Sequence, residues 1–169
     1  AAATAGTSST LVGRTVTGVE RFGKLISIDA DGLHLVFNLA RAGWVRYTES
    51  PSAAPLRPGK GPIAARVGFA GADGQHVGID LTEAGTKKSL AVYVVRDPRD
   101  VPGVAGLGPD PLDPGFGPGE FADILASHSQ QIKGVLRSQG VMAGIGNAYS
   151  DEILHAARIS PFAIASSLD

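Results

Sequence analysis

The segment 132-IKGVLRSQGVMAGIGNAYSDEILHAARISP-161 decides the fold of the C-terminal part of the chain. Its centre holds Gly144 and Gly146, which can adopt backbone angles that other residues resist. Asn147 follows, where a helix N-cap belongs. Apolar residues recur at helical spacing on both sides of this centre: Ile132, Val135 and Leu136 before it, and Tyr149, Ile153 and Ala156 after it. The segment therefore predicts two amphipathic helices joined by a tight glycine turn, the second capped by Asn147.

This turn has the features of a phosphate site. The amide of Gly146 lies beside the expected helix start, where backbone N–H groups and the helix dipole favour an anion. Lys133 and Arg137 lie one turn apart on the first helix and add positive charge suited to a nucleic-acid backbone. Helix–glycine–helix corners also serve packing alone, and the residues by themselves leave this alternative open.

The same residues carry a family resemblance. The run from Lys133 through Leu136 and Gln139 to AGIGNAYSDEIL resembles the helix-two-turn-helix signature of the formamidopyrimidine-DNA glycosylase and endonuclease VIII family. By this resemblance, Lys133 and Asn147 would hold the phosphates that flank a damaged nucleotide. The implied fold is α+β, an incomplete antiparallel β-sandwich followed by a helical domain, with DNA between the two parts.

The N-terminal half reads as short strands. Strand-like runs and turns alternate from Arg14 to Tyr47, most clearly in the hairpin around Ala30-Asp31-Gly32. Further runs follow at IAARVGFA, HVGIDL and SLAVYVV. Seven strands at this spacing favour a sandwich or a barrel.

Composition divides the chain into four expected segments. Proline and glycine are concentrated where the sequence changes from strand-forming to helix-forming, which is typical of a linker. A short helix is expected over Glu120–His128. The expected segments are a flexible tail (1–12), a β-sandwich domain (13–96), a linker (97–119) and a helical DNA-binding domain (120–169).

Composition also limits the function. With 169 residues, 43% of them hydrophobic, the chain can bury a core. No apolar run approaches the roughly 20 residues of a membrane span, and the start AAATAGTSST lacks the pattern of a secretory signal. We expect a soluble, cytoplasmic protein with no membrane partner. The formal charge of −1 differs from that of strongly basic DNA-binding proteins, so DNA contact requires a local basic patch.

The strand region adds weaker matches to the same family. GRTVTGVERFGKLISI resembles the segment whose lysine contacts the DNA backbone, which is Lys24 here. In LVFNLARAGWVRY, Arg41 replaces the methionine that fills the gap left by a flipped base, and a planar arginine can still enter a base stack. Counting back from LGPDPL by the family spacing makes Lys87 and Lys88 the counterparts of the loop that invades the duplex, rather than the Asp97-Pro98-Arg99 sequence. For each lysine, a solvated surface position is the alternative.

The catalytic residues of the family have no counterpart. Family members attack with an N-terminal proline amine and use the following glutamate as an acid, whereas this chain starts Ala1-Ala2-Ala3 and has no acid before Glu20. The family's C-terminal zinc finger is also missing from the match, which covers roughly residues 13–161. With no cysteine and four scattered histidines, we expect no metal site and no cofactor. The sequence therefore offers no catalytic residue.

We expect a protein that binds double-stranded DNA, damaged or abasic, in base excision repair of oxidised bases, with the glycosylase and abasic-site lyase chemistry absent or supplied elsewhere. Three alternatives stay open. The chain could be a fragment of an active DNA glycosylase and lyase. It could retain a lyase activity through the amine of Lys24 or Lys133. It could instead bind a protein partner, or a copy of itself, through an uncovered sheet edge.

Overall fold

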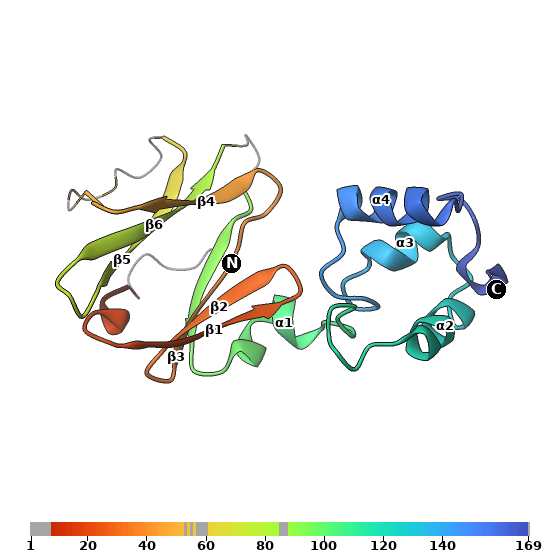
Figure 1. The fold of residues 1–169 in the computed structure, drawn as a ribbon, viewed down its shortest axis with the longest axis horizontal. Coiled ribbons are helices and arrows are strands. Elements are labelled where there is room, and N and C mark those ends of the chain that lie inside the picture. The colour runs from red at the N-terminus through yellow and green to blue at the C-terminus, as the bar shows by residue number, and fades with distance from the viewer. Residues whose placement is uncertain (1–7, 53, 55, 57–60, 85–87, 169) are drawn as a thin grey trace.

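The computed structural model describes residues 8–52, 54, 56, 61–84 and 88–168. A β-sandwich and a helical part lie side by side, and the segment that contains α1 (Pro102–Ala105) runs between them (Figure 1). This arrangement is the predicted α+β fold. Each of the seven strands in the described residues overlaps a run that the sequence marked as strand-like, although β4 and β6 extend one and two residues beyond theirs.

The first sheet has the order β1-β2-β3-β7 and is antiparallel throughout. Its strands are β1 (Val16–Phe22), β2 (Leu25–Ala30), β3 (Leu33–Asn38) and β7 (Ala91–Val95). The predicted hairpin is present between β2 and β3, where Asp31 and Gly32 both have positive φ. The Asp29 carboxylate accepts a hydrogen bond of 2.8 Å from the Gly32 amide and closes this turn.

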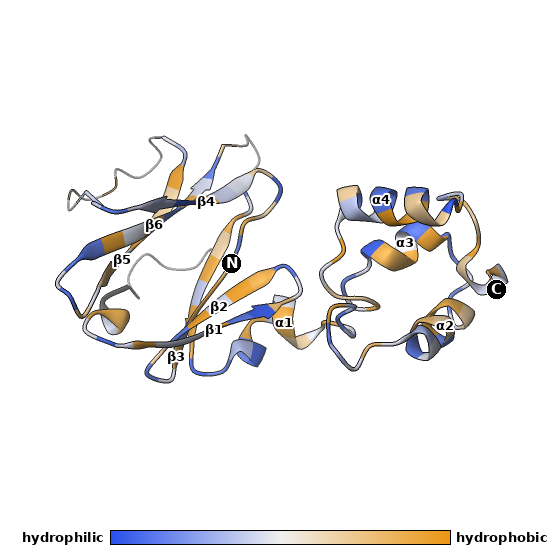
Figure 2. Ribbon diagram, viewed as in Figure 1, coloured by the Kyte–Doolittle hydropathy of each residue, from blue (hydrophilic) through white to orange (hydrophobic). Residues whose placement is uncertain are grey.

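The second sheet has the order β4-β6-β5, with β4 (Gly43–Thr48), β5 (Ile63–Ala70) and β6 (His76–Glu83). Ile28, Leu35 and Phe37 of the first sheet form the core with Leu81 of β6. In Figure 2, β2 is largely hydrophobic, whereas the neighbouring β1 becomes hydrophilic toward its end. This contrast fits their burial, since β2 is mostly buried and β1 is an exposed edge strand.

The sandwich is open at β4. Val45 and Tyr47 lie opposite Leu81 and Ile79 of β6, so they belong to the inner face of their sheet. Nevertheless Val45 is 38% exposed and Tyr47 is 60% exposed. The first sheet does not cover this edge, which confirms the prediction of an incomplete sandwich rather than a closed barrel.

Both segments that flank the sandwich have local structure. Within the predicted tail, residues 8–11 form a 3-10 turn, and Leu11 packs against the core between the sheets; residues 1–7 lie outside the described residues. In the predicted linker, η2 (Pro98–Asp100) precedes α1, and Asp97 caps η2 through the Arg99 amide. Val101 and Val104 of this segment pack against β2 and β3, so part of it belongs to the core.

The helical part consists of α2 (Pro118–Ala126), α3 (Ile132–Arg137), α4 (Asn147–Ala157) and the 3-10 turn η3 (Ala165–Ser167). The helix that we expected over 120–128 begins at Pro118 instead, because proline suits the first position of a helix. As predicted, α3 buries an apolar face. The buried core of this part contains Ile132, Val135, Leu136, Met142, Leu154 and Ala165.

The predicted apolar face of α4 is wrong. Tyr149 is 71% exposed and Ile153 is 38% exposed, and Ala156 is exposed as well. The helix buries Ser150 and Leu154 instead. Ser150 fits a buried position because it is small and because its hydroxyl donates a hydrogen bond of 2.6 Å to the Asn147 carbonyl.

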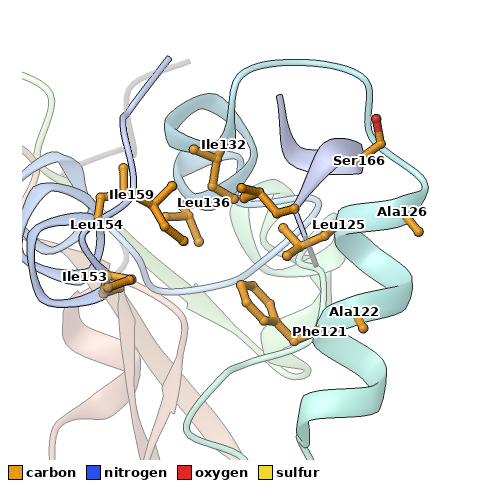
Figure 3. Close-up of a pocket in the computed structure, with 12 residues that line it drawn as sticks. Phe121, Ala122, Leu125, Ala126, Ile132, Leu136, Ile153, Leu154, Ile159 and Ser166 are labelled. Carbon is orange, nitrogen blue, oxygen red and sulfur yellow. The ribbon is translucent and has the colours of Figure 1, made fainter. Parts of the chain in front are cut away.

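An apolar cavity of about 260 Å³ lies between α2, α3 and α4 (Figure 3). Phe121 and Leu125 of α2 face Leu136 and Leu154 across it. Ser166 is the one polar residue among the described residues that line it. Because no titratable side chain lines this cavity, it offers no group for acid–base or nucleophilic chemistry.

Candidate nucleic-acid interface

The turn between α3 and α4 is held by a single glutamine side chain. Gln139 accepts a hydrogen bond of 3.0 Å from the Gly144 amide and donates one of 2.8 Å to the Ile145 carbonyl. Gly144 has φ +90°, an angle that a residue with a side chain rarely adopts. The turn is therefore fixed, and so is the direction of the helix that follows it.

The expected N-cap is wrong by one position. Gly146 has extended backbone angles and its carbonyl accepts the first helical hydrogen bond, at 2.9 Å from the Ser150 amide, so Gly146 is the N-cap. Asn147 is the first residue of α4, and its side chain is exposed. No side chain of the described residues caps this helix start. The first N–H groups of α4 are therefore open to an anion.

The turn between β1 and β2 packs directly on this helix start. Gly23 has φ +56° and is buried, and a Cβ atom placed on it would lie 3.2 Å from the Gly144 nitrogen. A Cβ atom on Gly146 would likewise lie 3.8 Å from the Nζ atom of Lys24. The glycines let the two turns approach each other and bring Lys24 to the N-terminus of α4. Figure 1 shows the β1–β2 end of the sandwich reaching toward the helical part.

Positive groups gather at this junction without a matching acid. Although Lys24 is an exposed residue, partial burial, and then the nearby charge of Arg137, lowers its pKa below the ordinary value. Among the described residues, neither Lys24 nor Arg137 forms an ion pair through its side chain. Lys24 and the positive end of a helix dipole thus meet at Gly146, and the charge of Arg137 acts on Lys24. An anion at this point would relieve their repulsion.

Arg21 differs from Lys24 although the two residues share a hairpin. Its guanidinium donates to the Asp110 carboxylate at 2.6 Å and to the Gly23 carbonyl at 3.1 Å. The hydrogen bond from Arg21 lowers the pKa of Asp110. The pair connects the sandwich to the segment before α2, so Arg21 holds the two parts together rather than adding free charge.

Lys133 has a partner. Its Nζ atom lies 2.5 Å from the Asp151 carboxylate of α4, in an ion pair that spans the glycine turn. The side chains are 27% and 52% exposed, respectively. Sequence reasoning did not foresee this pair. A phosphate that contacts Lys133 must share it with Asp151.

The other predicted contact residues are exposed and lie in loops. Arg41 lies in the turn between β3 and β4, which Figure 1 places on the side of the sandwich that faces the helical part. Lys88 precedes β7, and Lys87 lies outside the described residues. Neither Arg41 nor Lys88 has a hydrogen bond or ion pair to the described residues through its side chain. Both are therefore available to a ligand, but the structure does not join them to the Lys24 junction.

Neither a metal site nor a membrane-spanning helix is found among the described residues. In the described part of the chain, no group of three histidine, cysteine, aspartate or glutamate residues is placed to hold a metal ion. None of the described helices is long and apolar enough to cross a bilayer.

The fold and the junction define a class, a β-sandwich joined to a helix-two-turn-helix unit. Comparison with known proteins agrees, because residues 107–169 match the family described as "Formamidopyrimidine-DNA glycosylase H2TH domain". The chain is 37% identical to the formamidopyrimidine-DNA glycosylase of Moorella thermoacetica over 165 residues, which cover 96% of this chain and 56% of that protein. The corresponding protein of Geobacillus kaustophilus is 35% identical, with 94% and 54% covered. The chain belongs to the formamidopyrimidine-DNA glycosylase family.

Solved structures share this fold. The MutM (Fpg) protein of Thermus thermophilus superposes with a TM-score of 0.73 at 29% identity, covering 96% of this chain and 56% of that one. The Lactococcus lactis Fpg, solved in complex with DNA that contains an abasic site, has the same fold, with a TM-score of 0.69 at 23% identity. The chain spans about half the length of the relatives that it matches.

Proposed function

We propose that this protein binds double-stranded DNA by holding a backbone phosphate at the N-terminus of α4. The observation that carries the proposal is that Lys24 lies at the uncapped start of α4, near the charge of Arg137, and that neither cation has an ion pair among the described residues. A phosphate oxygen can accept hydrogen bonds from the free amides there while both cations offset its charge. The family membership supports DNA as the source of that phosphate.

Further contacts follow from the exposed groups around the junction. Asn147 presents an exposed side chain one residue from Gly146, and Lys133 lies one helix away, paired with Asp151. We place the phosphates that flank a damaged or abasic nucleotide at these two residues. Arg41 and Lys88, with Lys87, would then approach the DNA from the sandwich. Such phosphate contacts position the protein on the duplex and carry no sequence information.

The proposed role is in the repair of oxidised bases, as the resemblance to the family implies. Among the described residues, no carboxylate forms an ion pair with Lys24 at the junction, so the junction lacks an amine with an adjacent acid. We therefore assign base removal to groups other than those of this junction. The role of this chain would be to hold the lesion site.

DNA binding can be tested by fluorescence anisotropy with duplexes that carry or lack an abasic-site analogue, over a series of salt concentrations. We expect binding that weakens steeply with salt and prefers the lesion. Lys133→Ala with Asn147→Ala should bind at least about tenfold more weakly. Arg99→Ala with Gln75→Ala, which changes two exposed residues outside the junction, is the matched control. Equal binding by this double variant and the parent would refute the proposal, since Asn147 is the first residue of α4.

A second function, an abasic-site lyase, is favoured by the position of the Lys24 amine at the start of α4, beside Gly146. The lowered pKa of Lys24 increases the share of its neutral amine, which is the nucleophilic form. In this reaction the amine would add to the C1′ aldehyde of an opened abasic sugar and lose water to form an imine. Removal of a C2′ proton would then expel the 3′ phosphate and nick the strand.

Borohydride reduction of the imine would trap the protein on abasic DNA. Lys24→Arg keeps the charge but cannot form an imine, so we expect it to bind DNA and to lose the trapped species. Lys133→Arg is the control and should trap like the parent. Undiminished trapping by Lys24→Arg would exclude Lys24 as the nucleophile.

A further inference from the structure

Glu83, the last residue of β6, is a buried acid with no part in the contacts proposed above. It is 3% exposed, and it forms no ion pair with the described part of the chain. A carboxylate is costly to bury unless hydrogen bonds replace its contacts with water. The hydrogen bonds of Glu83 therefore indicate what this buried group does.

The Glu83 carboxylate holds the segment that follows Lys88. One of its oxygens accepts a hydrogen bond of 2.8 Å from the Ser89 amide, and the Leu90 amide donates to both oxygens, at 3.2 and 3.3 Å. Leu90 also packs against the core between the two sheets. Ser89 and Leu90 precede β7 and belong to no strand, so the backbone directly after Lys88 is fixed by a side chain instead of by strand pairing.

The backbone at the end of β6 also supports the turn between β3 and β4, which carries Arg41. β6 pairs with β4 as far as Glu83, and the Ala84 amide donates to the Ala42 carbonyl at 3.2 Å. Arg41 directly precedes Ala42, and both Arg41 and Lys88 are exposed. The end of β6 thus connects the backbone beside one exposed cation to the backbone beside the other. The turn that carries Arg41 lies on the side of the sandwich that faces the helical part (Figure 1).

We propose that Glu83 is a positioning residue for DNA binding, which holds Lys88 beside the turn of Arg41 so that the Lys88 ammonium group meets a backbone phosphate. The inference rests on the proposed function, because the phosphate belongs to the bound duplex. A lysine side chain is long and flexible, and a fixed backbone lowers the entropy cost of bringing its charge to one place. Because backbone amides occupy the Glu83 oxygens, the carboxylate positions Lys88 without neutralising it.

The direction of the expected effect separates this role from simple electrostatics. Removal of an acid makes a protein less negative, which by itself strengthens binding to DNA. If Glu83 positions Lys88, its removal weakens binding instead. We expect Glu83→Ala to bind an abasic-analogue duplex roughly threefold more weakly, with a smaller slope of affinity against salt concentration. Glu49→Ala, which removes an exposed acid, is the matched control and should bind at least as tightly as the parent.

Glu83→Asp tests the position of the carboxylate at constant charge. The side chain is shorter by one carbon–carbon bond, about 1.5 Å, so it cannot reach the Ser89 amide while β6 stays in place. We expect a loss of affinity similar to that of Glu83→Ala. This variant also provides the test if circular dichroism shows that Glu83→Ala does not fold. Full affinity in the folded Glu83→Asp protein would overturn the proposal.

A double-variant cycle shows whether Glu83 acts through Lys88. Lys88→Ala alone should weaken binding about fivefold. Glu83→Asp added to Lys88→Ala should weaken it no further, because the side chain that Glu83 positions is already gone. Added to Lys24→Ala, the same change should have its full effect, because Lys24 belongs to a different contact. Equal losses in both backgrounds would show a purely structural role and overturn the proposal.

The outcomes also separate this inference from the proposed function. A parent protein that does not bind DNA would overturn both. A parent that binds DNA and is weakened by Lys133→Ala with Asn147→Ala, but not by Lys88→Ala, would overturn only the role of Glu83.

Discussion

Two clusters of charge in this protein are built in opposite ways. In the sandwich, the fully buried Asp80 carboxylate lies between Arg66, at 2.6 Å, and Arg46, at 2.7 Å. At the junction of the two parts, Lys24 lies at the start of α4 and feels the charge of Arg137, and neither cation has an ion pair among the described residues. The first cluster is complete within the chain. The second is complete only when an anion from outside is present.

This difference separates a structural role from a binding role. The hydrogen bonds from Arg66, and then from Arg46, lower the pKa of Asp80, which means that the cluster favours the charged carboxylate. At the junction, burial and like charge lower the pKa of Lys24, so the fold opposes its charged form. We therefore expect changes in the first cluster to alter stability and changes in the second to alter affinity.

The largest expected effect is on stability. Asp80→Asn should lower the free energy of unfolding by about 2 kcal/mol, because it leaves a partly buried Arg66 without its carboxylate partner. Urea unfolding measures this change, with the exposed Asp100→Asn as the control. DNA affinity of the folded protein should stay the same. An affinity loss in this variant would mean that the two clusters are not separate.

The next effect is on affinity. Lys24→Ala with Arg137→Ala should weaken DNA binding by about 10- to 100-fold. The slope of affinity against salt concentration should fall by the equivalent of roughly one to two phosphate contacts. Stability should be unchanged or higher, because the variant removes two cations that repel each other. Arg96→Ala with Arg99→Ala, which removes the same charge elsewhere, controls for net charge. If the control loses as much affinity, the binding is non-specific attraction.

Acid should act on the first cluster in a predictable direction. Because the folded-state pKa of Asp80 is lowered, its contribution to stability is present above the unfolded pKa of about 4 and is lost as the pH falls through the folded pKa. When the pH is lowered from 7 into the acid range, the melting temperature should fall less in Asp80→Asn than in the parent. Equal losses would mean that other carboxylates dominate.

A smaller effect is expected from the residue that holds the turn. Gln139→Ala leaves the Gly144 amide and the Ile145 carbonyl without their partner and should cost about 1 kcal/mol of stability. Affinity should fall severalfold as well, because the amides at the start of α4 lose their fixed direction. Gln130→Ala, an exposed glutamine before α3, provides the comparison. Loss of stability with full affinity would show that phosphate binding does not need the fixed turn.

The smallest effect concerns Lys133. Asp151→Asn removes its partner, and since the pair is exposed, stability should change by no more than about 0.5 kcal/mol. The affinity for DNA should rise more in Asp151→Asn than in Glu152→Gln, which removes the same charge from the neighbouring residue. Equal gains in both variants would mean that Lys133 does not contact the phosphate.

The sequence predicted the features that depend on local chemistry. The hairpin at Asp31 and Gly32 follows from turn residues between two alternating runs, and the buried face of α3 follows from helical spacing. Most of the phosphate-site residues were identified from the resemblance to a family. Their roles as DNA contacts stay predictions.

The features that the sequence did not predict depend on packing between elements. α4 buries Ser150 and Leu154, and no spacing rule marks a serine as a core residue. The pair of Lys133 with Asp151 and the two hydrogen bonds of Gln139 arise only when the turn folds back. The N-cap is Gly146 and not the predicted Asn147, because the turn ends in an extended glycine. The sequence alone leaves this geometry open.

The central claim is that an anion completes the Lys24 junction. NMR observation of the Lys24 side chain during titration with a short abasic-site duplex tests it most directly. We predict that DNA raises the pKa of Lys24 toward its ordinary value and shifts the amide signals of Gly146 and Asn147, with saturation at one duplex per protein. An unchanged Lys24 pKa, with DNA-induced shifts confined to other residues, would contradict the account.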